Sequence, residues 1–151
     1  MTEGKIVGIC ISAEHGKIPN LVSSVNAIPG KGLENDRYFS QKDEGDKNEQ
    51  ELTLIESEKI FDFNKKFSTN FEIVEFRRNI ITKNISLNKL VGKEFHIGKV
   101  KVKGINLCEP CLYLQKKLNN SNIVKEFAHK GGLRAQILTE GTIYSSDLIR
   151  G

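Results

Sequence analysis

Hydrophobic residues recur along the chain mostly in short runs that are typical of β-strands. These runs are rich in valine and isoleucine, and turn residues such as Pro29-Gly30 separate them. In one run Lys99 and Lys101 alternate with valines, which predicts a half-buried strand whose lysines face water and resist edge pairing. The pattern predicts strands over Lys5 to Ser12, Leu21 to Ile28, Leu52 to Ile55, Phe71 to Phe76, Phe95 to Val102, Leu133 to Leu138 and Asp147 to Ile149.

Helical periodicity, with apolar residues three or four positions apart, is confined to short segments. The longest predicted helix runs from Ser57, the expected N-cap, to about Phe67. Two shorter helices are predicted around Leu114 to Leu118 and over Ile123 to Lys130, where Gly131-Gly132 stops the second. Because strands outnumber helices and do not alternate with them as β-α-β units, the sequence predicts a β-rich α+β fold, a barrel with a few flanking short helices.

Composition and charge restrict the class of protein. Of the 151 residues, 38% are hydrophobic and 28% charged, which suits a single domain spanning residues 1–151. The net charge of +4 comes from lysines interleaved with acids, so we expect no nucleic-acid partner. No run approaches the roughly 18 apolar residues of a membrane span, and Ile6 to Ile11 is too short for a signal peptide. With only three cysteines, the chain is predicted to be cytoplasmic and without a membrane partner.

The longest irregular stretch runs from Gly30 to Glu51 and is polar and charged. Loops of this length within a compact domain are usually functional or disordered. Within it, Asp36-Arg37 is suited either to bind a ligand or to pair internally.

Cys108 and Cys111 form a Cys-x-x-Cys pair, whereas Cys10 lies alone in an apolar strand. A structural zinc site would need four ligands, which the scattered histidines do not supply, and a thioredoxin-like dithiol would need a β-α-β surrounding. A nucleophilic or metal-binding thiolate at Cys111 is favoured by the preceding Pro110, since proline is common at helix starts and the helix dipole lowers a thiol pKa there. The remaining interpretation is a pair of small buried cysteines that only pack.

Arg77, Arg78 and Asn79 form a second candidate site. If the segment is extended, the two arginines place one guanidinium on each sheet face, where its fork suits phosphate or carboxylate. The Asn79 amide offers a donor and an acceptor to the edge of a heterocycle. A further arginine, Arg134, follows Gly131-Gly132, where the backbone permits close approach. The alternatives are surface ion pairing for each arginine and a helix C-cap for the glycines.

Taken in order along the chain, these stretches resemble the MOSC family, named for the C-terminal domain of molybdenum cofactor sulfurase. The resemblance covers nearly the whole chain and is carried by the ordered series of motifs. The matching stretches are Gly32 to Tyr38, Leu52-Thr53-Leu54-Ile55-Glu56, Arg77-Arg78-Asn79-Ile80, Leu90-Val91-Gly92-Lys93, Ile97-Gly98, Cys108-Glu109-Pro110-Cys111, Gly131-Gly132-Leu133-Arg134-Ala135 and Gly141 to Ile149.

The resemblance implies a MOSC-type β-barrel with a role in sulfur or molybdenum-cofactor chemistry. Family members share a cysteine that is proposed to carry sulfane sulfur or to ligate molybdenum, and it falls on Cys111, with Cys108 as its partner. The residues implied to hold the phosphate and pterin of the cofactor, molybdopterin, are Asp36, Arg37, Arg77, Arg78, Asn79 and Arg134.

Two loops depart from the family pattern. Asn35 stands where the family commonly has Gly before Asp-Arg, and Ser145-Ser146-Asp147 replaces a usual Gly-Asp, so we expect altered loop geometry. The chain also has no room for the pyridoxal-phosphate domain of full sulfurases, so a partner such as a cysteine desulfurase would have to supply the sulfur. Molybdenum-cofactor biosynthesis proteins or a molybdoenzyme would receive it.

Three functions follow from the resemblance and the residues. The first is a sulfur carrier or sulfur-transfer protein that uses a cysteine persulfide. The second is a molybdenum-cofactor binding protein or oxidoreductase with Cys111 as the metal ligand, and the third is a non-catalytic interaction domain with structural cysteines. The sequence leaves open whether the protein turns over a substrate, and also its oligomeric state.

Overall fold

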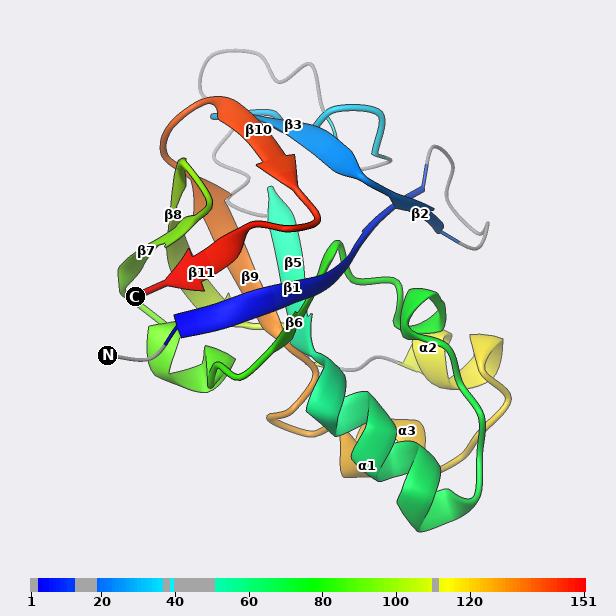
Figure 1. The fold of residues 1–151 in the computed structure, drawn as a ribbon. Helices are drawn as coiled ribbons and strands as arrows, with labels where there is room; N and C mark the ends of the chain where they lie inside the picture. Colours follow the sequence, from blue (N-terminus) through cyan, green and yellow to red (C-terminus); the bar gives the residue numbers. More distant parts are fainter. Residues whose placement is uncertain (1–2, 13–18, 37–38, 40–50, 110–111) are drawn as a thin grey trace.

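Seven strands close into a barrel in the computed structural model, which describes residues 3–12, 19–36, 39, 51–109 and 112–151 (Figure 1). Their order is β11-β7-β8-β9-β5-β6-β1, and β1 closes the ring because it pairs with both β6 and β11. The barrel pairings are antiparallel except that of β5 with β6. The strands are β1 (Glu3–Ile11), β5 (Leu52–Glu56), β6 (Ile80–Lys83), β7 (Glu94–Ile97), β8 (Val100–Leu107), β9 (Leu133–Ile137) and β11 (Leu148–Arg150).

A small second sheet has the order β10-β3-β4. Its strands are β3 (Ser24–Ile28), β4 (Gly32–Leu33) and β10 (Gly141–Tyr144), and it lies above the barrel in Figure 1. A further short strand, β2 (Asn20–Val22), pairs with β1. The buried side chains of the small sheet pack against the barrel interior, so both sheets share one core.

The helices gather on one side of the barrel (Figure 1). They are α1 (Ser57–Phe67), α2 (Leu112–Lys117) and α3 (Ile123–Glu126), with the 3₁₀ turn η1 (Ile73–Phe76) in the same outer core. The other 3₁₀ turn, η2 (Leu87–Leu90), contributes its buried leucines to the core inside the barrel. The predicted fold, a β-rich barrel with a few flanking short helices, is confirmed.

Two hydrophobic cores lie on opposite faces of the barrel wall. On β5, Leu52 and Leu54 point into the barrel, whereas Ile55 points outward, as the period of two in a strand requires. The outer core lies between the wall and the helices and contains a group of phenylalanines. Phe63 lies 5.3 Å from Phe127 between ring centroids, and Phe127 lies 4.9 Å from Phe76. Such pairs each contribute about 0.5–1.5 kcal/mol beyond their buried area.

Several predicted strands end earlier than the alternation indicates. The run from Phe95 to Val102 is a hairpin of β7 and β8 that turns at Gly98, where φ is +59°. Leu21 to Ile28 is likewise divided at Ser23 into β2 and β3. The lysines of the hairpin face water as predicted, and β8 lies between β7 and β9 in the closed barrel. Alternation continues across a tight turn and therefore cannot reveal it.

The segment from Phe71 to Phe76, predicted as a strand, is not one: its last four residues form the 3₁₀ turn η1. A capping box closes it: the Glu72 N–H donates to the Glu75 carboxylate at 2.6 Å. Its last residue is followed by Arg77 at φ +62°, so the arginine pair is not extended as the sequence suggested. The N-cap of α1 is also one residue earlier than predicted, at Glu56, whose side chain makes no capping hydrogen bond.

Candidate functional site at the Cys108 segment

A row of outward-facing residues crosses five neighbouring strand positions of the barrel. Cys10 on β1 pairs with Asn79, since its N–H donates to the Asn79 carbonyl at 2.7 Å. Thr53 on β5 lies opposite Arg134 on β9, and Arg134 lies opposite Asn106 on β8. Residues directly opposite one another on neighbouring strands share a face, and Cys10 belongs to the outer core. The row therefore lies on the outer wall and ends two residues before Cys108.

Asn79 holds three strands together. Its amide Nδ2 donates to the Cys10 carbonyl at 3.1 Å, and its Oδ1 accepts the Thr53 N–H at 3.0 Å. The Asn79 N–H donates in return to the Thr53 hydroxyl at 3.0 Å. Because this buried amide uses its donor and its acceptor within the protein, its contacts position the start of β6 against β1 and β5.

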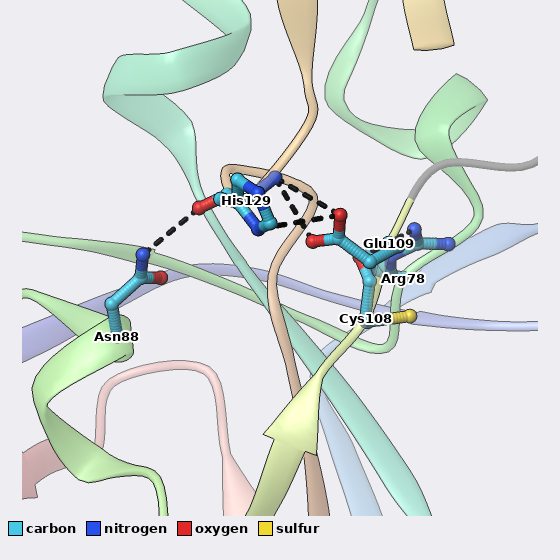
Figure 2. A network of polar contacts seen from close by, with 5 residues as sticks. All are labelled: Arg78, Asn88, Cys108, Glu109 and His129. Atoms are coloured by element: carbon cyan, nitrogen blue, oxygen red, sulfur yellow. Dashed lines mark hydrogen bonds and ion pairs between the residues drawn. The ribbon is translucent and has the colours of Figure 1, made fainter.

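Arg78 connects the Arg77–Asn79 segment to the backbone of Cys108 (Figure 2). Its Nη2 donates to the Cys108 carbonyl at 3.4 Å and its Nε donates to the Gly131 carbonyl at 2.9 Å. Its Nη1 donates to the Phe76 carbonyl at 3.4 Å. The Cys108 N–H donates to the Gly132 carbonyl at 2.8 Å, so the backbone of Cys108 is held on both sides.

Glu109 extends this network to the turn that precedes β9 (Figure 2). Its carboxylate oxygens accept the His129 N–H at 2.9 and 3.2 Å, and the His129 Nδ1 lies 3.6 Å from one of them. Asn88, on η2, donates from its side chain to the His129 carbonyl at 2.9 Å. The turn is further fixed at Gly132, where φ is +114° and an added Cβ would overlap the Leu54 carbonyl oxygen.

The three cysteines have different surroundings. Cys10 is buried in the outer core, and this burial raises the pKa of its thiol from 9.0 to about 12, so it stays protonated at neutral pH. The Cys108 side chain is buried as well, with 5% of its surface exposed. Cys111, the predicted thiolate and metal ligand, lies outside the described residues, and α2 begins at the next residue, Leu112.

The loop residues Asp36 and Arg37 are only partly described. Arg37 lies outside the described residues. Asp36 is buried, and its Oδ1 accepts the Ser12 N–H at 2.9 Å, which ties the loop to the end of β1. Asn35 adopts φ +69°, a left-handed conformation that asparagine tolerates better than most residues, at the position where the family commonly has glycine.

Arg77 lines a cavity of about 210 Å³. Pro19, Glu75, Lys117 and Leu118 form the rest of its wall. Lys117 could not be recognised from the sequence, because a lysine in the last turn of a helix is common. The sequence also did not reveal the Glu109–His129 contact, which joins residues 20 positions apart.

The predicted site residues thus fall into separate groups. Arg78 and Cys108 are in contact, Asn79 and Arg134 lie on the row beside them, and Arg77 faces its own cavity. Among the described residues, no three His, Cys, Asp or Glu side chains are placed to hold a metal ion together. Within the same residues, no helix is long and apolar enough to cross a membrane.

The closed seven-strand barrel, with short helices packed on the outer face of its wall, defines a class of small β-barrel domains. The family profile of the MOSC domain matches residues 41–150, and the chain belongs to this family.

Solved structures share the fold at low sequence identity. The YuaD protein of Bacillus subtilis superposes with a TM-score of 0.83 at 14% identity, covering 97% of this chain and 94% of that one. YiiM from Geobacillus stearothermophilus gives 0.75 at 16% identity, covering 97% and 74% of the two chains. YiiM from Escherichia coli gives 0.73 at 16% identity, covering 99% and 69%. No curated protein matches the sequence.

Proposed function

We propose that this MOSC protein is a single-domain sulfur carrier whose Cys111 thiolate accepts sulfane sulfur and passes it on. The contact between Arg78 and the Cys108 carbonyl supports this function, because it brings the arginine segment to the cysteine segment across 30 positions of sequence. A guanidinium beside a thiol segment favours the anionic form of sulfur. A reducing cytosol would keep the thiols free for this chemistry.

The transfer step needs no oxidant. The Cys111 thiolate attacks the terminal sulfur of a donor persulfide, the S–S bond of the donor breaks, and the donor leaves as a thiolate. The proton of the terminal sulfur stays on it, so Cys111 becomes a persulfide. A cysteine desulfurase is the expected donor, since that class of enzyme carries a persulfide on its own cysteine.

The sulfur can leave Cys111 in two ways, and Cys108 takes part in one of them. Its thiol, once deprotonated, attacks the Sγ of the Cys111 persulfide, and hydrosulfide leaves as a Cys108–Cys111 disulfide forms. An external dithiol then reduces the disulfide and restores both thiols. Otherwise a nucleophile on a molybdenum-cofactor biosynthesis protein or a molybdoenzyme takes the terminal sulfur directly, and Cys111 leaves as the thiolate.

Intact-mass measurement after incubation with a cysteine desulfurase and free cysteine tests the proposal. Wild type and Cys10→Ser should each gain the mass of one sulfur atom, because the buried Cys10 thiol takes no part. Cys111→Ser should gain none, and Cys108→Ser should gain sulfur but release less hydrosulfide. Equal gain by Cys111→Ser and wild type would refute the assignment.

The cavity beside Arg77 favours a second function, the binding of the molybdenum cofactor. Arg77 and Lys117 bring two cations, and Glu75 one carboxylate, to a space that is smaller than the roughly 300–1,000 Å³ of typical ligand pockets, so the net positive charge suits one anionic end of a ligand. These residues fit the phosphate end of molybdopterin, and the Cys111 thiolate would be the ligand to molybdenum. The bound cofactor would supply redox chemistry at its metal.

Elemental analysis and the fluorescence of the oxidised pterin distinguish the second function from the first. A cofactor-binding protein retains molybdenum and pterin after incubation with the cofactor, and Arg77→Ala lowers the amount retained. If Cys108→Ala and Cys111→Ala alter thermal stability but leave sulfur loading and cofactor retention unchanged, the cysteines are structural and the domain serves interaction alone.

A further inference from the structure

Glu109 is the residue between Cys108 and the rest of the cysteine segment, and neither proposed sulfur step uses its carboxylate. We propose that Glu109 is a positioning residue: its carboxylate binds the backbone of His129 and thereby holds the Cys108 segment in one orientation for sulfur transfer. This inference rests on the proposed function and assigns one of its determinants.

Three anchors support the proposal, and all of them lead to the same turn. The Cys108 N–H donates to the Gly132 carbonyl, and Arg78 bridges the carbonyls of Cys108 and Gly131. The Glu109 carboxylate adds the third anchor at His129. Cys108 is thus held through its backbone, whereas Glu109 is held through its side chain.

The turn itself is rigid enough to serve as an anchor. His129 adopts φ +61°, and its carbonyl accepts a hydrogen bond from Asn88 of η2. Three residues later, Gly132 packs so closely against the Leu54 carbonyl that no side chain fits. A contact to this turn therefore connects Glu109 to η2 and to β5 at the same time.

The geometry of the carboxylate fits a hydrogen-bonding role better than a purely electrostatic one. Both oxygens accept the same N–H, at 2.9 and 3.2 Å, whereas the nearer imidazole nitrogen is 3.6 Å away. The His129 side chain is 80% exposed and that of Glu109 is 46% exposed, so water screens the charge of the pair. An amide oxygen at position 109 would preserve the hydrogen bond without the charge.

Two variants separate positioning from charge. Glu109→Ala removes both the acceptor and the charge, whereas Glu109→Gln removes the charge and keeps one acceptor oxygen. Glu140→Ala is the matched control, because Glu140 is exposed and the structure shows it in no hydrogen bond or ion pair with the described residues.

The rate of sulfur loading from a cysteine desulfurase is measured together with amide hydrogen exchange at His129 and Cys108. Glu109→Ala should load sulfur roughly 3- to 10-fold more slowly, the factor expected for one exposed hydrogen bond, and its two amides should exchange faster. Glu109→Gln should stay within about twofold of wild type on both measurements. Glu140→Ala should match wild type.

The proposal is overturned if Glu109→Ala loads sulfur at the rate of wild type, or if Glu109→Gln loads as slowly as Glu109→Ala. The second result would mean that the charge acts and the hydrogen bond does not. If wild type takes up no sulfur at all, the proposed function fails instead. Positioning is then decided by the alkylation rate of Cys111 with iodoacetamide, which should still differ between Glu109→Ala and Glu109→Gln.

Discussion

Replacing Gly132 by alanine should destabilise the protein more than the same change at any open glycine. The residue has φ +114°, a region that L-amino acids rarely adopt, and its missing Cβ would overlap the carbonyl oxygen of Leu54 on β5. Neither group can move alone, because Gly132 leads directly into β9 and Leu54 lies within the barrel wall.

The magnitude has a backbone part and a packing part. A residue forced into a sparsely populated φ region costs about 1–3 kcal/mol. Overpacking that displaces a rigid backbone neighbour costs about 1–3 kcal/mol more. The total of about 2–6 kcal/mol should lower the Tm by roughly 4–24 °C, since a domain of this size shifts by about 2–4 °C per kcal/mol.

The control is Gly92→Ala, which isolates the backbone part. Gly92 has φ +77°, and an added Cβ would meet no atom within 4 Å, so the substitution should cost about 1–2 kcal/mol. Urea titration and calorimetry of both variants measure the difference. If Gly132→Ala unfolds at the same urea concentration as Gly92→Ala, the overlap with the Leu54 carbonyl costs nothing and the predicted difference is refuted.

The remaining predictions concern the hydrogen bonds and the buried thiol around the Cys108 segment. Asn79→Ala leaves buried backbone groups on β1 and β5 without their partner and should lower the free energy of unfolding by about 2–4 kcal/mol in a urea titration; a loss below 0.5 kcal/mol, the usual size for a surface change, would contradict this. Arg78→Lys keeps the charge but loses the planar fork, so amide exchange at Cys108 should accelerate roughly 3- to 10-fold; unchanged exchange would show that the guanidinium contacts do not hold the segment. In a variant that carries Cys108→Ser and Cys111→Ser, Cys10 is the remaining cysteine, and a thiol reagent should label it at pH 8 only after the protein unfolds. Burial raises the pKa of Cys10 from 9.0 to about 12, so its contribution to stability is complete below pH 9.0 and is lost as the pH rises towards 12. The urea midpoint should therefore fall over this range relative to that of Cys10→Ala, and a constant difference between the two midpoints would contradict the assignment.

The barrel was largely predictable from the sequence because buried strands are rich in apolar, β-branched residues. Leu52 to Ile55 and Leu133 to Leu138 are apolar or alternate in the strand period, and each contributes a barrel strand. The failures share a physical cause. Gly98 turns the chain without interrupting the alternation, and Phe76 packs in the outer core from a 3₁₀ turn as well as it would from a strand. The hydrophobic pattern indicates which side chains are buried, but it does not indicate the backbone conformation of the residues that carry them.

The candidate site was less predictable, because its contacts depend on strands far apart in the sequence. Arg78 and Asn79 were recognised as polar residues of interest, but their partners were not. The guanidinium binds carbonyls that come into reach only when β6 and β9 have taken their places beside β5, and the Asn79 amide fits between β1 and β5 for the same reason. The sequence identifies the side chains that can donate hydrogen bonds. It does not identify their backbone acceptors, because every residue has a carbonyl group.

The closure of the barrel between β1 and β11 has a consequence for how the chain reaches its folded state. Glu3 lies opposite Arg150, so the pairing that seals the ring joins strands nearly 150 positions apart, and the two side chains form an exposed ion pair at 3.1 Å. Contacts of such separation form late, because the entropy of ordering the intervening chain is lost before they contribute. On the ribosome, Glu3 to Lys5 of β1 must therefore wait with one edge open until β11 has emerged, whereas Ile9 to Ile11 pair with the nearby β2. During that interval the exposed edge of β1 is where a chaperone would be needed, and a destabilising change near the seam should reduce the yield of folded protein before it alters the finished molecule.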